Sequence, residues 1–232
     1  MKFLKPTLAL ISMAVIISGC NNKKIGKVDL KTKSDSLSYA IGVNMGNNIK
    51  SSKIENVNIM AVANGLSDVQ EGKKDVMTPE KSIEIIQKYL MNQQKAIGEK
   101  NLAEGKKFLE ENAKKEGVIV DAEGFQYKML QEGSGPMPKE TDVVKVNYKG
   151  TLIDGTEFDS SYKQNKPAEF PLNGVIHGWT LALQKMKVGS KMMLWLPANL
   201  AYGERGGGPI GPNQVLIFEV ELLEIVKQQP KK

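Results

Sequence analysis

From Thr78 to Gly117 the only proline is Pro79, and this constrains the fold more than any other feature of the sequence. Thr78 can cap a helix whose first residue is Pro79, and the segment predicts one helix about 55 Å long at 1.5 Å per residue. Gly98 and Gly105 each weaken such a helix by about 1 kcal/mol relative to alanine. Its second half is mostly polar, which is typical of a solvated spacer between domains, and Gly117 is the predicted C-cap.

Two shorter helices are predicted before the long one, over residues 34–48 and 57–69, because each segment repeats apolar residues at helical spacing. Gly42 and Gly46 lie one turn apart in the first of them and would allow another helix to approach closely in water. Residues 34–117 are therefore predicted to form an all-α domain that includes the long helix.

The pattern changes after residue 117, where apolar runs alternate with turn residues and only 178–186 reads as helical. These runs predict an α+β domain over 118–226, an antiparallel β-sheet wrapped around one short helix. The predicted strands are 125–130, 143–148, 192–196 and 215–226.

The first twenty residues have the features of an export signal. Lys2 and Lys5 precede an apolar run of about ten residues, which is too short to span a bilayer as a helix. The residues before Cys20, the single cysteine, resemble a bacterial lipobox, which implies that 1–19 is removed and Cys20 is acylated. Residues 20–33 would then be a polar tether. A plain signal peptide or a buried N-terminal helix are the alternatives.

Charge argues against a nucleic-acid partner. The formal net charge is +6, but the C-terminal domain is acidic, and a basic tail covers 227–232. Arg205 is the only arginine among 32 basic residues, whereas proteins that bind nucleic acids use arginine for bidentate contacts. No nucleic-acid binding is expected.

Groups for metal binding or nucleophilic catalysis are scarce. The chain has one histidine, His177, and one cysteine, and it has no phosphate-binding loop or Gly-x-Ser-x-Gly segment. We therefore expect no metal and no cofactor, and His177 is expected to face outward without a role.

Aromatic residues are concentrated instead in five segments of the C-terminal domain. These are Val-Asn-Tyr-Lys-Gly-Thr (146–151), Gly-Thr-Glu-Phe-Asp-Ser-Ser (155–161), Gly-Val-Ile-His-Gly-Trp (174–179), Leu-Ala-Tyr-Gly (200–203) and Leu-Ile-Phe-Glu-Val-Glu-Leu-Leu (216–223). In this order and spacing they resemble the FKBP-type peptidyl-prolyl cis–trans isomerases. The helical segment before them is similar in layout to the dimerisation arm of the Mip/FkpA-like bacterial lipoproteins of that family.

Prolyl isomerisation suits a site without acid–base or metal chemistry. The barrier is about 18–20 kcal/mol of lost amide resonance, and X–Pro bonds are close to balanced between cis and trans. A dry aromatic pocket with one or two donors for the twisted carbonyl would lower that barrier.

The resemblance implies a role for each matching residue. The catalytic group would be Tyr148, Phe158, Asp159, Ile176 (through its N–H) and Tyr202. The proline ring would be bound by Phe170, Val175, Trp179, Ile210 and Phe218, with Trp179 as the floor. Asp159 would hydrogen-bond Tyr148 or the ligand, although a plain turn residue is the alternative reading, and Phe170 could equally be part of the core.

Three positions depart from the family pattern: Gln164, Ala168 and Gly211 stand where many members have arginine, an aromatic residue and proline. We expect isomerase activity with weaker macrolide binding.

The resemblance also implies a homodimer through 34–117, unfolded or proline-containing polypeptides as partners, and a folding-helper role. The expected location is the bacterial cell envelope, lipid-anchored at the outer membrane and facing the periplasm. A binding module with little turnover and a surface-displayed interaction protein are the alternatives.

Overall fold

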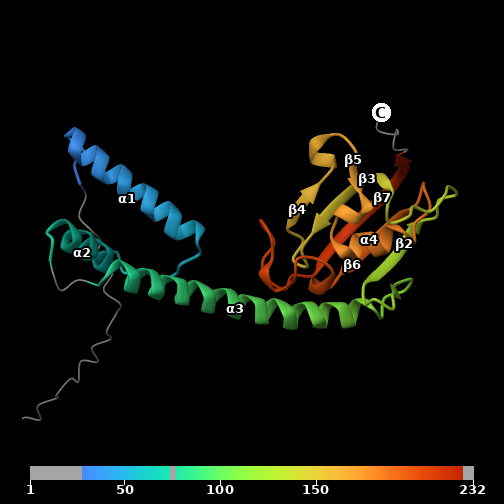
Figure 1. The fold of residues 1–232 in the computed structure, drawn as a ribbon, viewed down its shortest axis with the longest axis horizontal. Helices are drawn as coiled ribbons and strands as arrows, with labels where there is room; N and C mark the ends of the chain where they lie inside the picture. The colour runs from blue at the N-terminus through green and yellow to red at the C-terminus, as the bar shows by residue number, and fades with distance from the viewer. Residues whose placement is uncertain (1–27, 74–76, 227–232) are drawn as a thin grey trace, which may run out of the picture. The chain divides into compact units, whose positions relative to one another are not determined.

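The computed structural model describes residues 28–73 and 77–226, and these form two compact units divided between residues 67 and 68 (Figure 1). The predicted signal peptide, Cys20, most of the predicted tether and the tail 227–232 lie outside the described residues. Within the described ranges, no helix combines the length and apolar character that a membrane crossing needs.

The first unit is helical, as predicted. It contains α1 (Lys33–Ser51) and the larger part of α2 (Ile59–Gln70). Thr32 begins α1 through a reciprocal cap, since its hydroxyl accepts from the Asp35 N–H at 3.0 Å and the Asp35 carboxylate accepts from the Thr32 N–H at 3.1 Å. No residue of α1 or α2 is buried in the described chain. These helices therefore have no core of their own.

The second unit contains the end of α2 and then α3 (Pro79–Asn112). The Thr78 hydroxyl caps α3 and accepts from the Lys81 N–H at 3.2 Å. The helix ends at Asn112, so the predicted C-cap at Gly117 was wrong. Residues 113–117 form turns instead, and Gly117 lies there at φ +77°, where glycine is favoured.

The expectation that the second half of α3 is a solvated spacer was also wrong. Its buried residues are Gly98, Asn101, Gly105 and Asn112, which share one face. A Cβ at Gly105 would lie 2.7 Å from Cγ2 of Val215, so glycine allows the helix backbone to reach the domain. Glycine and asparagine lower helix propensity, but here their small size and amide groups create a contact surface.

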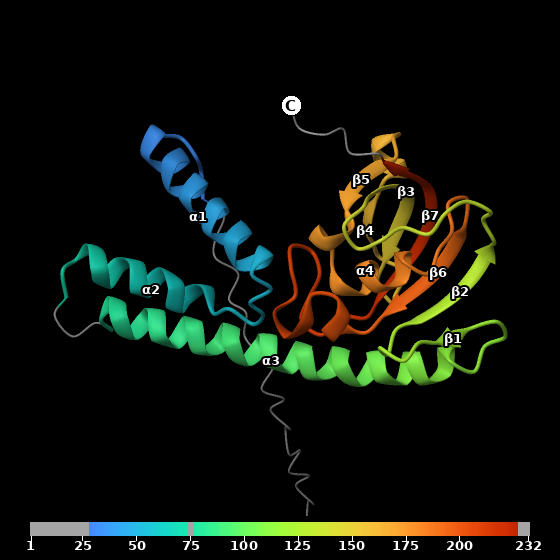
Figure 2. The same ribbon diagram turned by 45° about the vertical axis from the view of Figure 1, so that its right-hand side comes forward.

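The rest of the unit is the predicted α+β domain, with a seven-stranded antiparallel sheet (Figure 2). The strand order is β1-β2-β6-β7-β3-β4, and β5 pairs with β3. The strands are β1 (Ile119–Val120), β2 (Gln126–Gln131), β3 (Val143–Thr151), β4 (Glu157–Ser160), β5 (Ala168–Pro171), β6 (Lys191–Leu196) and β7 (Leu216–Val226).

The four predicted strands are present, whereas β1, β4 and β5, of two to four residues, had no clear alternating pattern. The short helix α4 (His177–Leu183) packs on the sheet as predicted, and its Trp179, Ala182 and Leu183 belong to the buried core.

Candidate active site

A pocket of about 480 Å³ opens beside α4 in the second unit. Strands β3, β4, β5 and β7, the start of α4 and the segment after β6 each contribute to its wall. The lining residues are Tyr148, Phe158, Asp159, Phe170, Gly174, Val175, Ile176, Trp179, Tyr202 and Phe218.

Trp179 lies at the centre of an aromatic cluster. Its ring packs edge-on against Tyr148 at 5.2 Å, Phe218 at 5.2 Å and Phe170 at 5.7 Å between ring centroids. Phe158 in turn packs edge-on against Phe218 at 5.6 Å. Trp179 is only 4% exposed, so the lining is apolar and rigid where a ligand ring would rest.

Two glycines bring this cluster together. A Cβ at Gly178 would lie 2.5 Å from Cδ2 of Leu196, so α4 rests directly on β6. A Cβ at Gly150 would lie 2.6 Å from Cζ of Phe158 and 2.9 Å from Cε1 of Phe218, so both rings occupy the space above β3. Each glycine is required for a close approach and not for an unusual φ.

The polar part of the pocket centres on the Tyr148–Asp159 pair. The Tyr148 hydroxyl donates to Oδ2 of Asp159 at 2.6 Å, and Oδ1 accepts from the Ser160 N–H at 2.8 Å. Burial, with the Asp159 hydrogen bond, raises the pKa of Tyr148 well above its usual value. Tyr148 therefore remains a protonated donor that orients the carboxylate.

Tyr202 is a second polar group of the pocket that reaches solvent, at 43% exposed. It immediately precedes the 3₁₀ helix η4 (Gly203–Arg205), in the connection between β6 and β7. Its hydroxyl is available to a ligand entering from solvent.

The structure brings nine of the ten predicted site residues to this one pocket. Ile210 is absent from the lining: it is buried in the core, and its backbone pairs with Gly207. Gly174 lines the pocket and was missed, because a glycine before Val175 carries no chemical signal. Phe170 is both pocket wall and half-buried core neighbour, and His177 is exposed, as expected.

Comparison with known proteins covers nearly the whole described chain. Residues 135–223 match the family model of the FKBP-type peptidyl-prolyl cis-trans isomerase, and 34–129 match the domain amino terminal to it. The FKBP-type 22 kDa peptidyl-prolyl cis-trans isomerase of Escherichia coli is 45% identical over 82% of this chain and 94% of that protein.

This chain belongs to the FKBP-type peptidyl-prolyl cis-trans isomerases.

Two further relatives of this FKBP-type isomerase span both of its parts. The protein named outer membrane protein MIP from Legionella longbeachae is 43% identical over 85% of this chain and 88% of its own length. The crystal structure of FkpA from Escherichia coli has a TM-score of 0.67 at 35% identity and covers 84% of this chain and 97% of that chain. The enzyme class and the Mip/FkpA-like resemblance are thus confirmed.

The described residues of this isomerase contain no group of three His, Cys, Asp or Glu side chains that could hold a metal ion. The pocket instead offers aromatic walls and two side-chain hydroxyls. It can bind a ring and hydrogen-bond a carbonyl.

Proposed function

We propose that the pocket above Trp179 binds the proline ring of an X–Pro segment and stabilises the twisted amide. The observation that supports this most directly is the edge-on packing of three aromatic rings around one buried indole, with the Tyr202 hydroxyl at the exposed rim. Such a site removes water from the imide bond and still offers a donor to its carbonyl.

Rotation weakens the amide resonance, and the carbonyl loses delocalised charge and hydration as the bond twists. Apolar walls from Phe158 and Phe218 favour the less polar twisted form over the planar form. The Tyr202 hydroxyl and the Ile176 N–H would donate to substrate carbonyls. Asp159, held by Tyr148, would orient the backbone next to the proline. No bond breaks, so no general base is required.

Phe158→Ala and Tyr202→Phe test this assignment. Phe158→Ala is expected to lower kcat/KM for a short X–Pro peptide about tenfold or more, because it removes an apolar wall. Tyr202→Phe is expected to lower it about three- to tenfold, because it removes one donor. The measurement is NMR exchange between the cis and trans peptide signals with the full-length chain in detergent.

His177→Ala is the control, because His177 is exposed and adjacent to the pocket in sequence but does not line it. The assignment fails if both pocket variants match the parent. A peptide that binds the parent without faster exchange would favour the binding-module alternative, for which the differences at Gln164, Ala168 and Gly211 are the reason.

We further propose that the chain acts as a dimer through residues 34–117 and helps unfolded polypeptides to fold. The support is the exposure of Leu37 (64%), Ile41 (51%) and Val69 (70%) on helices with no buried residue. A hollow of about 460 Å³ beside Gly42 on α1 would receive side chains from a second copy. Two pockets on one client chain would bind by avidity.

The proposed location is the outer membrane, facing the periplasm, with acylated Cys20 as the anchor. A multiply acylated cysteine buries many methylenes at about 0.8 kcal/mol each, which is sufficient for stable anchoring. Cys20→Ser, expressed in a Gram-negative bacterium, is expected to move the protein out of the outer-membrane fraction and to abolish radioactive palmitate incorporation. Ser18→Ala, beside the cleavage site, is the control that keeps the thiol. Unchanged fractionation of Cys20→Ser would contradict the lipid anchor.

A further inference from the structure

Two buried asparagines connect α3 to the catalytic domain, eleven residues apart. Nδ2 of Asn101 donates to the Pro212 carbonyl at 2.8 Å. Nδ2 of Asn112 donates to Oε1 of Gln126 at 2.9 Å, and Nε2 of Gln126 donates to the Leu109 carbonyl at 2.8 Å. The first connection reaches the loop before β7, whereas the second reaches β2.

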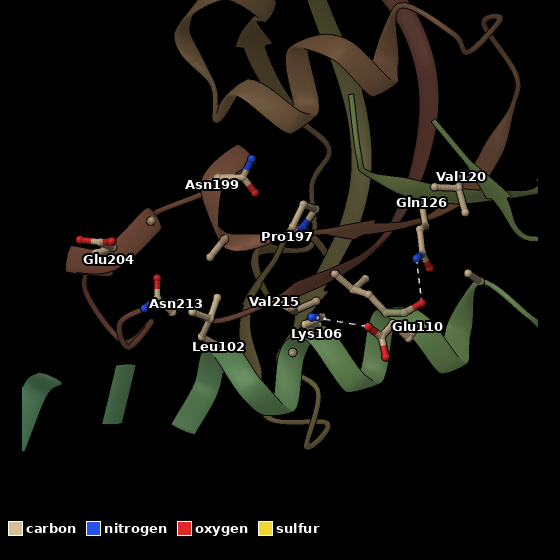
Figure 3. A pocket seen from close by; sticks show the side chains of 15 residues that line it. Leu102, Lys106, Glu110, Val120, Gln126, Pro197, Asn199, Glu204, Asn213 and Val215 are labelled. Atoms are coloured by element: carbon tan, nitrogen blue, oxygen red, sulfur yellow. Dashed lines mark hydrogen bonds and ion pairs between the residues drawn. The ribbon is translucent and has the colours of Figure 1, made fainter. Parts of the chain in front are cut away.

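A cavity of about 610 Å³ lies between these two connections (Figure 3). Leu102 and Asn213 lie toward one end of it in this view, and Gln126 lies toward the other. Within this space α3 contacts the domain closely at Gly105, where a Cβ would lie 2.7 Å from Cγ2 of Val215. The polar contacts at the two ends add hydrogen bonds that fix the position of α3 on either side of that contact.

The Asn101 connection continues to the active site through a short series of contacts. Asn213 follows Pro212, and its Nδ2 donates back to the Gly98 carbonyl at 3.2 Å. The Asn213 N–H donates to the Gly203 carbonyl at 2.9 Å, and Gly203 is bonded to Tyr202. Residues 212 and 213 are therefore held to α3 on one side and to the Tyr202 segment on the other.

The loop that these contacts close also packs on the Tyr202 ring. The Gly207 N–H donates to the Ile210 carbonyl at 2.8 Å, and the Ile210 N–H donates to the Gly207 carbonyl at 3.0 Å. A Cβ at Gly207 would lie 2.8 Å from Cδ1 of Tyr202, so the ring lies directly against the loop backbone. A shift of the loop would therefore shift the ring.

We propose that Asn101 is a positioning residue for Tyr202: α3 holds the loop 206–213, and this loop sets the direction of the Tyr202 hydroxyl. The inference rests on the proposed function, in which Tyr202 donates to a substrate carbonyl. It gives the second half of α3 a role in turnover.

A double-mutant cycle on the full-length chain in detergent tests the inference, with kcat and KM for an X–Pro peptide and the melting temperature as readouts. Asn101→Ala is expected to lower kcat about three- to tenfold with little change in KM. In the Tyr202→Phe background the same change is expected to cost less than about 1.5-fold, because the donor that it positions is gone.

Asn112→Ala is the matched control, since it also removes a buried amide hydrogen bond between α3 and the domain. It is expected to lower the melting temperature about as much as Asn101→Ala while kcat changes less than about 1.5-fold. Asn213→Gly is the second variant if Asn101→Ala does not fold. Asn213 has φ +54°, which glycine adopts without strain, and the change removes the side-chain bond to Gly98 while the backbone bond to Gly203 stays.

Non-additive kcat losses at Asn101 and Tyr202, together with a nearly unchanged kcat in Asn112→Ala, would support the inference. Additive losses, or an equal kcat loss in Asn112→Ala, would overturn it while leaving the proposed function intact. If Tyr202→Phe alone has no effect, the proposed role of Tyr202 fails, and the positioning inference fails with it.

Discussion

Replacement of Trp179 by alanine is expected to lower the free energy of unfolding by about 3–5 kcal/mol and to reduce isomerisation of a short X–Pro peptide about 100-fold or more. The indole is 4% exposed and packs edge-on against Tyr148, Phe170 and Phe218, so its removal leaves a large cavity in the core and takes away the pocket floor. Urea denaturation followed by circular dichroism gives the first quantity, and NMR exchange gives the second.

Trp179→Phe is the matched control for the alanine variant. Nε1 of Trp179 is buried and has no hydrogen-bond partner within the described residues, so phenylalanine removes no hydrogen bond and keeps an aromatic floor. We expect a stability loss of less than about 2 kcal/mol and measurable turnover. A loss below about 1 kcal/mol in Trp179→Ala would contradict the central place of the indole in the core.

The pocket could be predicted from the sequence because its residue types come in five segments with recognisable order and spacing. Strands β3 and β7 also alternate clearly, since one face of each is buried. Trp179 alone would more often be a core residue than a pocket residue. The segment around it, with Val175 and Ile176, carried the family resemblance that implied a pocket, and the structure brings these three residues together.

The contact between α3 and the domain could not be predicted in the same way. Gly98, Asn101 and Gly105 lower helix propensity and carry no apolar side chain, so local rules assign that face to solvent. Their value depends on partners more than a hundred residues away in the chain, at Pro212 and Val215. No periodic pattern in a single sequence reports such a pairing.

Ile210 shows a related limit of sequence reasoning within the site. The loop 206–213 closes through the Gly207–Ile210 backbone pair and the Asn213–Gly203 bond, and this directs the Ile210 side chain into the core. The five segments end before this loop and resume after it. Its conformation depends on glycines with φ above zero at 206 and 208, which the sequence permits but does not order.

Leu37→Asp is expected to convert the proposed dimer into a monomer at micromolar concentration, raising the dimer dissociation constant about 100-fold or more. Leu37 is 64% exposed on α1, a helix with no buried residue among the described ones, so packing against a second copy would remove its side chain from water. A carboxylate there would have to be desolvated without a partner when the dimer forms. Sedimentation velocity of the full-length chain in detergent measures the change.

Met137→Asp is the control, because Met137 is 52% exposed and apolar but belongs to the catalytic domain, so this variant should stay dimeric.

The catalytic domain of the Leu37→Asp monomer keeps its pocket, and kcat/KM for a short X–Pro peptide should remain within about twofold of the parent. Refolding of a long client with several prolines should slow much more, because avidity needs two linked pockets. A parent chain that sediments as a monomer would contradict the dimer. A monomeric variant that refolds the long client as fast as the parent would separate dimerisation from the folding-helper role.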